Sequence, residues 1–268
     1  MSKEISKKIE LLPPDPKNDG ITWGPWGAII TIIVIFFVES VVASLAIVVY
    51  ASLKSQNVTQ ATNWLSNSIP YEFWFTVFAE ALIVAGVWFF IRIRKGNWRA
   101  IGLYRPQKID TAYPFIGLVI YYPIYIIAAS ILAALTKLNI NQQQNTGFSQ
   151  SITGWPLILV FICLVVLPPI AEEIAFRGFL YNGLKKSLPK IWAVIVTGII
   201  FAIPHALESQ SGGLLWIAVV DTFILSAVLC WLREKTGRLY AGMGLHALKN
   251  FIAFVYVFHI FQQLNFHF

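Results

Sequence analysis

Charged side chains are scarce in this chain of 268 residues: 12% are charged, whereas 57% are hydrophobic. A soluble domain carries roughly twice that charged share, so the composition excludes one and indicates an integral membrane protein. Cysteine is scarce too, since Cys163 and Cys230 are the only two and both fall in long apolar runs. This excludes a disulfide framework and a C-x-x-C metal or redox pair. The segment 1–20 lacks the short apolar core and the cleavage site of a secretory signal, so we expect no cleavable signal.

Long apolar runs, by contrast, are abundant. A run of about 20 residues is enough to cross a bilayer as a helix. Such runs cover 26–50, 71–93, 112–136, 155–184, 190–208, 213–232 and 240–262. The predicted fold class is therefore all-α, a polytopic membrane protein with about seven transmembrane helices. The fourth run is long for one straight helix and contains Pro168 and Pro169, which predict a break because proline cannot continue the backbone hydrogen-bond ladder.

Lysine and arginine collect in alternate loops, which predicts the orientation. Segment 92–108 holds six of them, and further basic residues follow the fourth and sixth spans, at 185–190 and 233–238. The other loops are nearly free of them. Because cytoplasmic loops are enriched in basic residues, we expect a cytoplasmic N-terminus. The net charge of +7 then reflects topology and attraction to anionic membrane lipids, with no nucleic-acid partner.

Polar side chains inside the spans require an explanation, because each ionised group near the bilayer centre costs about 3 kcal/mol or more. In "EEIAFR", Glu173 and Arg177 stand at i and i+4 with the acid first, which predicts a structural ion pair. Glu172 points roughly 100° away around the helix and is left without a partner by that pairing. Asp221, Glu80 and Glu39 belong to no motif, and we interpret them as packing or cavity-edge groups.

Two further motifs supply polar groups at matching depth. "FAIPH" ends in His205, and "HALKN" presents His246 and Asn250 on one helix face. At about 1.5 Å per helical residue from the nearest basic anchor, Glu172, His205, His246 and Asn250 lie roughly 20, 22, 12 and 18 Å deep. The four groups are therefore expected to share one buried cavity.

A buried carboxylate beside imidazole and amide groups can activate a water molecule, which is hydrolase chemistry. The same groups could instead bind a divalent metal such as zinc, with Glu172, His205 and His246 as the ligands. No H-E-x-x-H motif is present, so the residues alone leave metal use open.

The three motifs occur in the order of E-E-x-x-x-R, F-x-x-x-H and H-x-x-x-[ND], and they resemble those of the CAAX-protease and bacteriocin-processing family. These are the Abi or CPBP intramembrane glutamate proteases, which include lysostaphin resistance protein A-like members. The resemblance covers about 155–262. It implies that Glu172 activates water, that His205 assists this base, and that His246 and Asn250 form an oxyanion hole. It also implies that Glu173 and Arg177 brace the helix.

The domain prediction follows the same resemblance. We expect a cytoplasmic tail at 1–25, three accessory transmembrane helices with their loops at 26–150, and a conical catalytic bundle of the last four helices at 151–268. The expected location is a bacterial plasma membrane.

The expected function is an intramembrane endopeptidase that cuts a membrane-associated peptide or protein near the cytoplasmic side and requires no cofactor. One alternative is a non-catalytic family scaffold, acting in bacteriocin self-immunity or in regulation of a partner membrane enzyme. A proton-coupled transporter is less favoured, because the chain shows no inverted halves with matched broken helices.

Overall fold

The computed structural model describes residues 20–54, 56–136, 142, 144–210 and 212–260. The N-terminal part consists of α2 (Pro25–Leu53), α3 (Val58–Ser66), α4 (Ile69–Ile93), the 3-10 turn η1 (Trp98–Ile101) and α5 (Ile109–Thr136). One long helical stretch follows, made of α6 (Pro156–Phe161), η2 (Ile162–Val166), α7 (Leu167–Glu172), η3 (Glu173–Leu180) and α8 (Tyr181–Lys185). The chain ends in α9 (Lys190–Ala202), the 3-10 turn η4 (Ile203–Leu207), α10 (Trp216–Thr236) and α11 (Tyr240–Val257).

The all-α prediction is confirmed. Within the described residues, six helices are long and apolar enough to cross a membrane. They are Pro25–Leu53, Ile69–Ile93, Ile109–Thr136, Pro156–Lys185, Lys190–Leu207 and Trp216–Thr236. The seventh predicted span forms α11, but it is not among the six. It carries His246, Lys249 and Asn250 in its middle, and these polar side chains make it less apolar than the others.

The break predicted at Pro168 and Pro169 is wrong, because the stretch from Pro156 to Lys185 is one continuous helix. It accommodates the prolines by widening. The segments η2 and η3, on either side of α7, are π-helical. Such wide turns inside α-helices occur frequently at functional sites.

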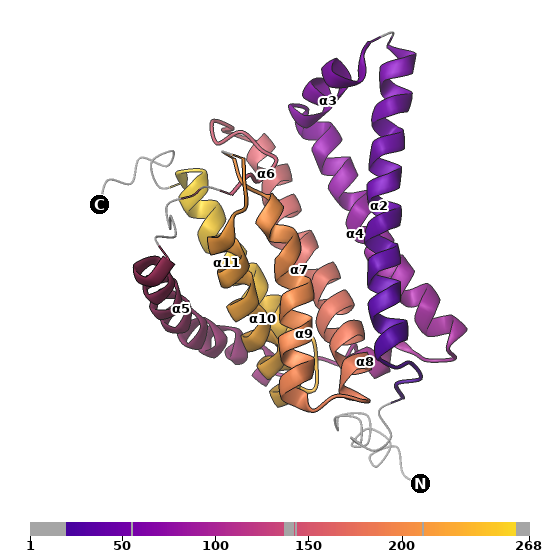
Figure 1. Cartoon of the computed structure of the whole chain (residues 1–268), viewed down its shortest axis with the longest axis vertical. Helices are drawn as coiled ribbons and strands as arrows, with labels where there is room; N and C mark the ends of the chain where they lie inside the picture. The colour runs from indigo at the N-terminus through magenta and orange to yellow at the C-terminus, as the bar shows by residue number, and fades with distance from the viewer. Residues whose placement is uncertain (1–19, 55, 137–141, 143, 211, 261–268) are drawn as a thin grey trace.

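The N-terminal helices flank the bundle on two sides (Figure 1). Helices α2 and α4 pack against each other, and α4 also contacts α7 and η3. On the other flank, α5 packs on both α10 and α11. The long stretch 156–185, α9, α10 and α11 lie between these flanks.

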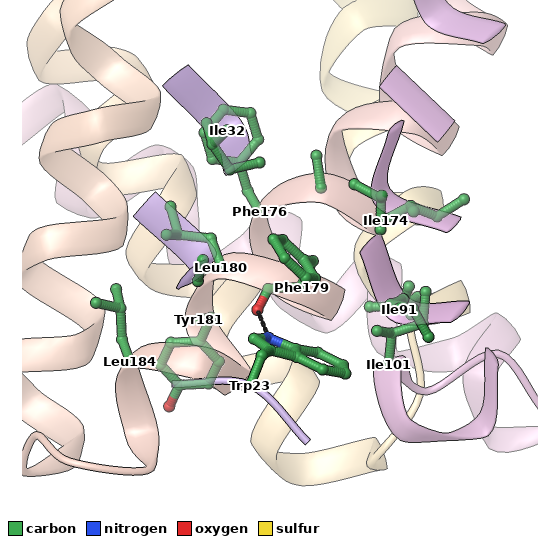
Figure 2. Close-up of a cluster of buried hydrophobic side chains, with 14 of the residues drawn as sticks. Trp23, Ile32, Ile91, Ile101, Ile174, Phe176, Phe179, Leu180, Tyr181 and Leu184 are labelled. Carbon is green, nitrogen blue, oxygen red and sulfur yellow. Dashed lines mark hydrogen bonds between the residues drawn. The ribbon is translucent and has the colours of Figure 1, made fainter. Parts of the chain in front are cut away.

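A cluster of buried apolar side chains joins α2 and α4 to η3 (Figure 2). Trp23 stacks on Phe179 with ring centroids 5.0 Å apart, and its indole Nε1–H donates to the Phe179 carbonyl at 3.1 Å. Ile32 of α2 and Ile91 of α4 belong to the same cluster. Every residue of η3, from Glu173 to Leu180, is buried as a result. The charged groups of this segment therefore lie at the centre of the protein.

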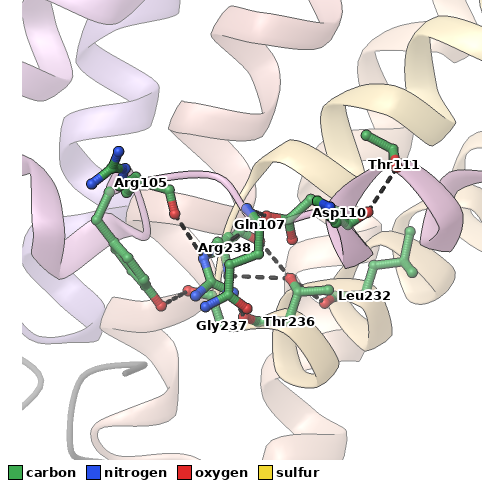
Figure 3. Close-up of polar contacts among 10 residues, drawn as sticks. Arg105, Gln107, Asp110, Thr111, Leu232, Thr236, Gly237 and Arg238 are labelled. Atoms are coloured by element: carbon green, nitrogen blue, oxygen red, sulfur yellow. Dashed lines mark hydrogen bonds and ion pairs between the residues drawn. The ribbon is translucent and has the colours of Figure 1, made fainter. Parts of the chain in front are cut away.

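A second, polar cluster fastens α5 to the turn between α10 and α11 (Figure 3). The buried Arg238 donates from Nε to the Arg105 carbonyl at 3.2 Å and lies 3.8 Å from the Asp110 carboxylate. Tyr104 lies 5.0 Å from the Arg238 guanidinium and donates to the Gly237 carbonyl at 2.8 Å. These contacts fix the start of α11, which carries two of the predicted site residues.

Candidate active site

Glu173 and Arg177 lie at the centre of the bundle as a local ion pair. Arg177 Nη1 donates to Glu173 Oε1 at 2.9 Å, and neither side chain is exposed. The Arg177 guanidinium also lies over the Phe201 ring of α9, 4.2 Å from its centroid. Helix α11 approaches this pair closely because it has glycine at position 242: a Cβ there would lie 2.7 Å from Glu173 Oε2. The pair thus holds α11 and α9 against η3.

His246 lies between the two adjacent glutamates. Its Nδ1 is 3.4 Å from Glu173 Oε1, and its Nε2 is 3.7 Å from Glu172 Oε2. The imidazole is buried and meets the Phe201 ring edge-on, with centroids 6.0 Å apart. Glu172, which the sequence left without a partner, therefore faces an imidazole whose other nitrogen faces a carboxylate. Such an arrangement orients the imidazole in acid–base sites.

His205 lies where α9 tightens into η4, one turn beyond Phe201. Its Nδ1 is 3.1 Å from the Phe201 carbonyl. A carbonyl oxygen can only accept, so Nδ1 carries the proton in this contact and Nε2 remains an acceptor. The Ile203 N–H still donates to the Ile199 carbonyl of α9, but Pro204 has no N–H for the next bond of the ladder, which accounts for the change from α9 to η4.

Asn250 donates from Nδ2 to the Leu164 carbonyl at 2.9 Å. In an α-helical register that carbonyl would accept from residue 168, and in a π-helical register from residue 169. Both are proline, which has no N–H. Asn250 therefore satisfies a carbonyl that its own helix cannot. A carboxamide has a second N–H, which remains for another acceptor.

All four predicted catalytic residues line one cavity of about 660 Å³. The sequence argument placed Glu172, His205, His246 and Asn250 at compatible depths, and the fold brings them to a common surface. The wall also includes Lys249, Thr222 and Glu208. A cavity of this size holds several residues of an extended peptide.

The cavity opens away from the basic loops. Its rim includes Gln144, Gln150 and His259. Gln144 pairs with Ser209 in an isolated antiparallel bridge and donates from its side chain to Glu208. The start of α6 and the end of α11 lie at this end of the bundle, opposite the α8–α9 and α10–α11 connections (Figure 1). Under the predicted topology this end is external, so the position of the cavity mouth does not support the expected cleavage near the cytoplasmic side, which stays a prediction.

Sequence reasoning missed two charged side chains of the wall, Glu208 and Lys249, and Lys249 is the one with an ion pair to another helix. Lys249 Nζ lies 2.9 Å from Asp221 Oδ2, and the Tyr121 hydroxyl donates to Asp221 Oδ1. The sequence indicates only a packing or cavity-edge role for Asp221, and no motif links it to Lys249. The available signal was a lysine in the middle of an apolar run, one position before Asn250.

The three candidate metal ligands do not form a ligand set. In the described part of the chain, no group of three His, Cys, Asp or Glu side chains could hold a metal ion. Glu172 and His246 lie together, but His205 is not grouped with them. The independence of catalysis from zinc stays a prediction.

Comparison with known proteins identifies the region that carries the site. Residues 154–252 match the family described as Type II CAAX prenyl endopeptidase Rce1-like, so the resemblance seen in the motifs is confirmed. The uncharacterized protein YyaK of Bacillus subtilis is 25% identical over 178 residues, which cover 65% of this chain and 57% of the relative. The UPF0177 protein YxdF of Lactococcus lactis is 22% identical over 121 residues, covering 45% and 63%. The chain thus spans about three fifths of each curated relative. No solved structure matches it.

Proposed function

We propose, from the Rce1-like match of residues 154–252, that this multi-pass membrane protein is an intramembrane endopeptidase whose general base is Glu172. The observation that carries the proposal is the shared cavity of Glu172, His205, His246 and Asn250. These residues come from three separate motifs and three different helical segments. Because they line one cavity, a base, two imidazoles and an amide can act together on one peptide bond.

The first step is the activation of water. The Glu172 carboxylate takes a proton from a water molecule, and the hydroxide oxygen bonds to the scissile carbonyl carbon. His205 Nε2, which is free to accept, can hold the second proton of that water and orient it. His246 keeps its Nε2 towards Glu172 because its Nδ1 faces Glu173.

The second step needs donors for the developing oxyanion. His246 lies on α11 one turn before Asn250, and both line the cavity. The second amide N–H of Asn250 can donate to the oxyanion while the first stays on Leu164. Such preorganised donors are worth about 3–4 kcal/mol each in related acyl-transfer sites. Collapse of the intermediate breaks the C–N bond, and the Glu172 carboxyl returns its proton to the leaving amine.

The substrate class follows from the place of the site. The cavity lies among membrane-spanning helices and opens at one end of the bundle, which favours a membrane-associated peptide or the end of a membrane protein. Peptides with and without a prenyl group, compared in the assay below, distinguish the two kinds of substrate. A bacterial plasma membrane is the proposed location.

A peptide-library assay tests the proposal. Purified protein in detergent or bicelles is incubated with membrane-proteome peptides, and new ends are identified by mass spectrometry. We expect cleavage by the wild type and none by Glu172→Gln, with thermal unfolding unchanged. Glu39→Gln is the matched control, because Glu39 lies on α2 and does not line the cavity. Full activity of Glu172→Gln would refute the mechanism.

Two further arms address metal use and the alternatives. Chelator treatment with elemental analysis should leave cleavage unchanged; loss of activity with removal of one zinc, and recovery with its return, would make the protein a metalloprotease. A wild type that cleaves nothing would favour the non-catalytic scaffold for self-immunity or for a partner membrane protein. Proton uptake in proteoliposomes would favour the transporter.

A further inference from the structure

One charged pair beside the cavity has no part in the chemistry above, and only Lys249 of the two lines the cavity. Lys249 lies on α11 and Asp221 on α10, with Nζ and Oδ2 2.9 Å apart. Their side chains are only 16% and 17% exposed, and both residues fall in spans predicted from the sequence. Placing a charged side chain inside the membrane costs free energy, and such residues usually have a functional role.

The pair extends to a helix outside the family match. Tyr121 of α5 donates its hydroxyl proton to Asp221 Oδ1, and its ring stacks on Tyr125 with centroids 5.9 Å apart. Helix α5 lies before residue 154, where the family match begins. It nevertheless packs tightly on α11, since a Cβ at Gly244 would lie 2.6 Å from Pro114 Cγ. Lys249, Asp221 and Tyr121 therefore form a cluster that joins α5, α10 and α11, and we call it the Lys249 cluster.

Three side chains of α11 determine how this helix is rotated. His246 faces the two glutamates, Asn250 reaches the Leu164 carbonyl of η2, and Lys249 reaches Asp221 of α10. Residues at i, i+3 and i+4 lie on one side of a helix, spread over about 100°. A rotation of α11 that lengthened the Lys249–Asp221 contact would therefore also move His246 and Asn250. The Lys249–Asp221 contact and the orientation of His246 and Asn250 are therefore coupled.

We propose that the Lys249 cluster is a positioning device for the catalytic site, by which α5 and α10 hold His246 and Asn250 in register with Glu172. The inference rests on the proposed function. It makes α5 a part of the active unit, although the family match does not include it. A misplacement of about 1 Å at a reacting centre can lower a rate roughly 100-fold.

The test uses a double variant that removes both charges, so that neither partner is left as an unpaired buried charge. Lys249→Met/Asp221→Asn removes both charges together and keeps similar side-chain shapes. We expect the double variant to stay folded, with kcat lowered about 10- to 100-fold and KM changed much less, because alignment is lost while the shape of the cavity wall is largely kept. Lys249→Arg keeps a cation and should retain most of kcat. Lys235→Met, which replaces an exposed lysine at the end of α10, is the matched control.

A second measurement does not depend on cleavage. Hydrogen exchange of the α11 amides should be faster in the double variant, while that of α9 is unchanged. An unchanged kcat in the folded double variant would overturn the inference. If the wild type shows no Glu172-dependent cleavage, the proposed function fails by itself, and the exchange result then decides: unchanged α11 amides refute the positioning role, and faster ones support it.

Discussion

Arg177 carries a permanent charge at a point that solvent does not reach, and among the described residues it forms an ion pair with Glu173 on the same helix. We predict that Arg177→Met lowers the free energy of unfolding by about 3–5 kcal/mol, because it leaves Glu173 as an uncompensated buried charge. Thermal unfolding in detergent measures the loss. Cleavage should fall with it, since Glu173 also orients His246.

The double variant Glu173→Gln/Arg177→Met is the control for this prediction, because it leaves no charge behind. It should recover most of the stability but not the cleavage activity. Equal instability of the single and double variants would show that packing of the guanidinium on Phe201, and not charge, is what Arg177 contributes.

The Glu173–Arg177 contact could be predicted from the sequence because helical geometry alone brings i and i+4 together. The Glu172–His246 contact could not, since it joins residues from two helices that are distant in the sequence. The depths estimated from the helical rise place both groups within the membrane, but they do not give the rotation of each helix about its axis. Lys249 was missed for the same reason, because its partner lies on α10.

The stretch Pro156–Lys185 depends on another helix for a hydrogen bond. We predict that Asn250→Ala costs about 1 kcal/mol of stability, because the Leu164 carbonyl at the cavity wall is left without a protein donor. Cleavage should be lost as well if the same amide holds the oxyanion. Unfolding and cleavage assays on the purified variant measure the change in the free energy of unfolding and the change in the cleavage rate.

Reintroducing a backbone donor separates these two roles of Asn250. In the Asn250→Ala background, Pro168→Ala or Pro169→Ala supplies an N–H, in the α or the π register respectively. One of these double variants should recover stability, and neither should recover cleavage. Recovery of cleavage would mean that Asn250 acts only on the helix and not on the substrate.

The extents of the helices could be predicted from hydropathy, but the state of the double proline could not. Proline is expected to end a helix because it lacks the N–H that would bond to a carbonyl one turn earlier. That expectation fails where a side chain of another helix donates to the same carbonyl. Asn250 lies far along the chain from Leu164, so only the folded arrangement shows that the carbonyl is satisfied and the helix continues.

The whole molecule has one end rich in basic residues and a cavity that opens at the other. We predict that thiol reagents added outside intact cells label Gln150→Cys and Gln210→Cys, whereas Lys108→Cys and Lys235→Cys react only after lysis. All four positions are exposed. The native Cys163 and Cys230 are at most 1% exposed and provide an unreactive background. The opposite labelling pattern would reverse the topology and make the cavity mouth cytoplasmic.

The placement of the two ion pairs also bears on biosynthesis. Glu173 and Arg177 neutralise each other within a single helix, so the stretch 156–185 can leave the translocation channel with that pair already formed. Lys249 and Asp221 belong to successive helices, and neither charge is compensated until both helices are present. A lone helix with an unpaired charge enters lipid unfavourably. We therefore expect helices α10 and α11 to enter the bilayer together, as a hairpin, after α5 is in place to receive them.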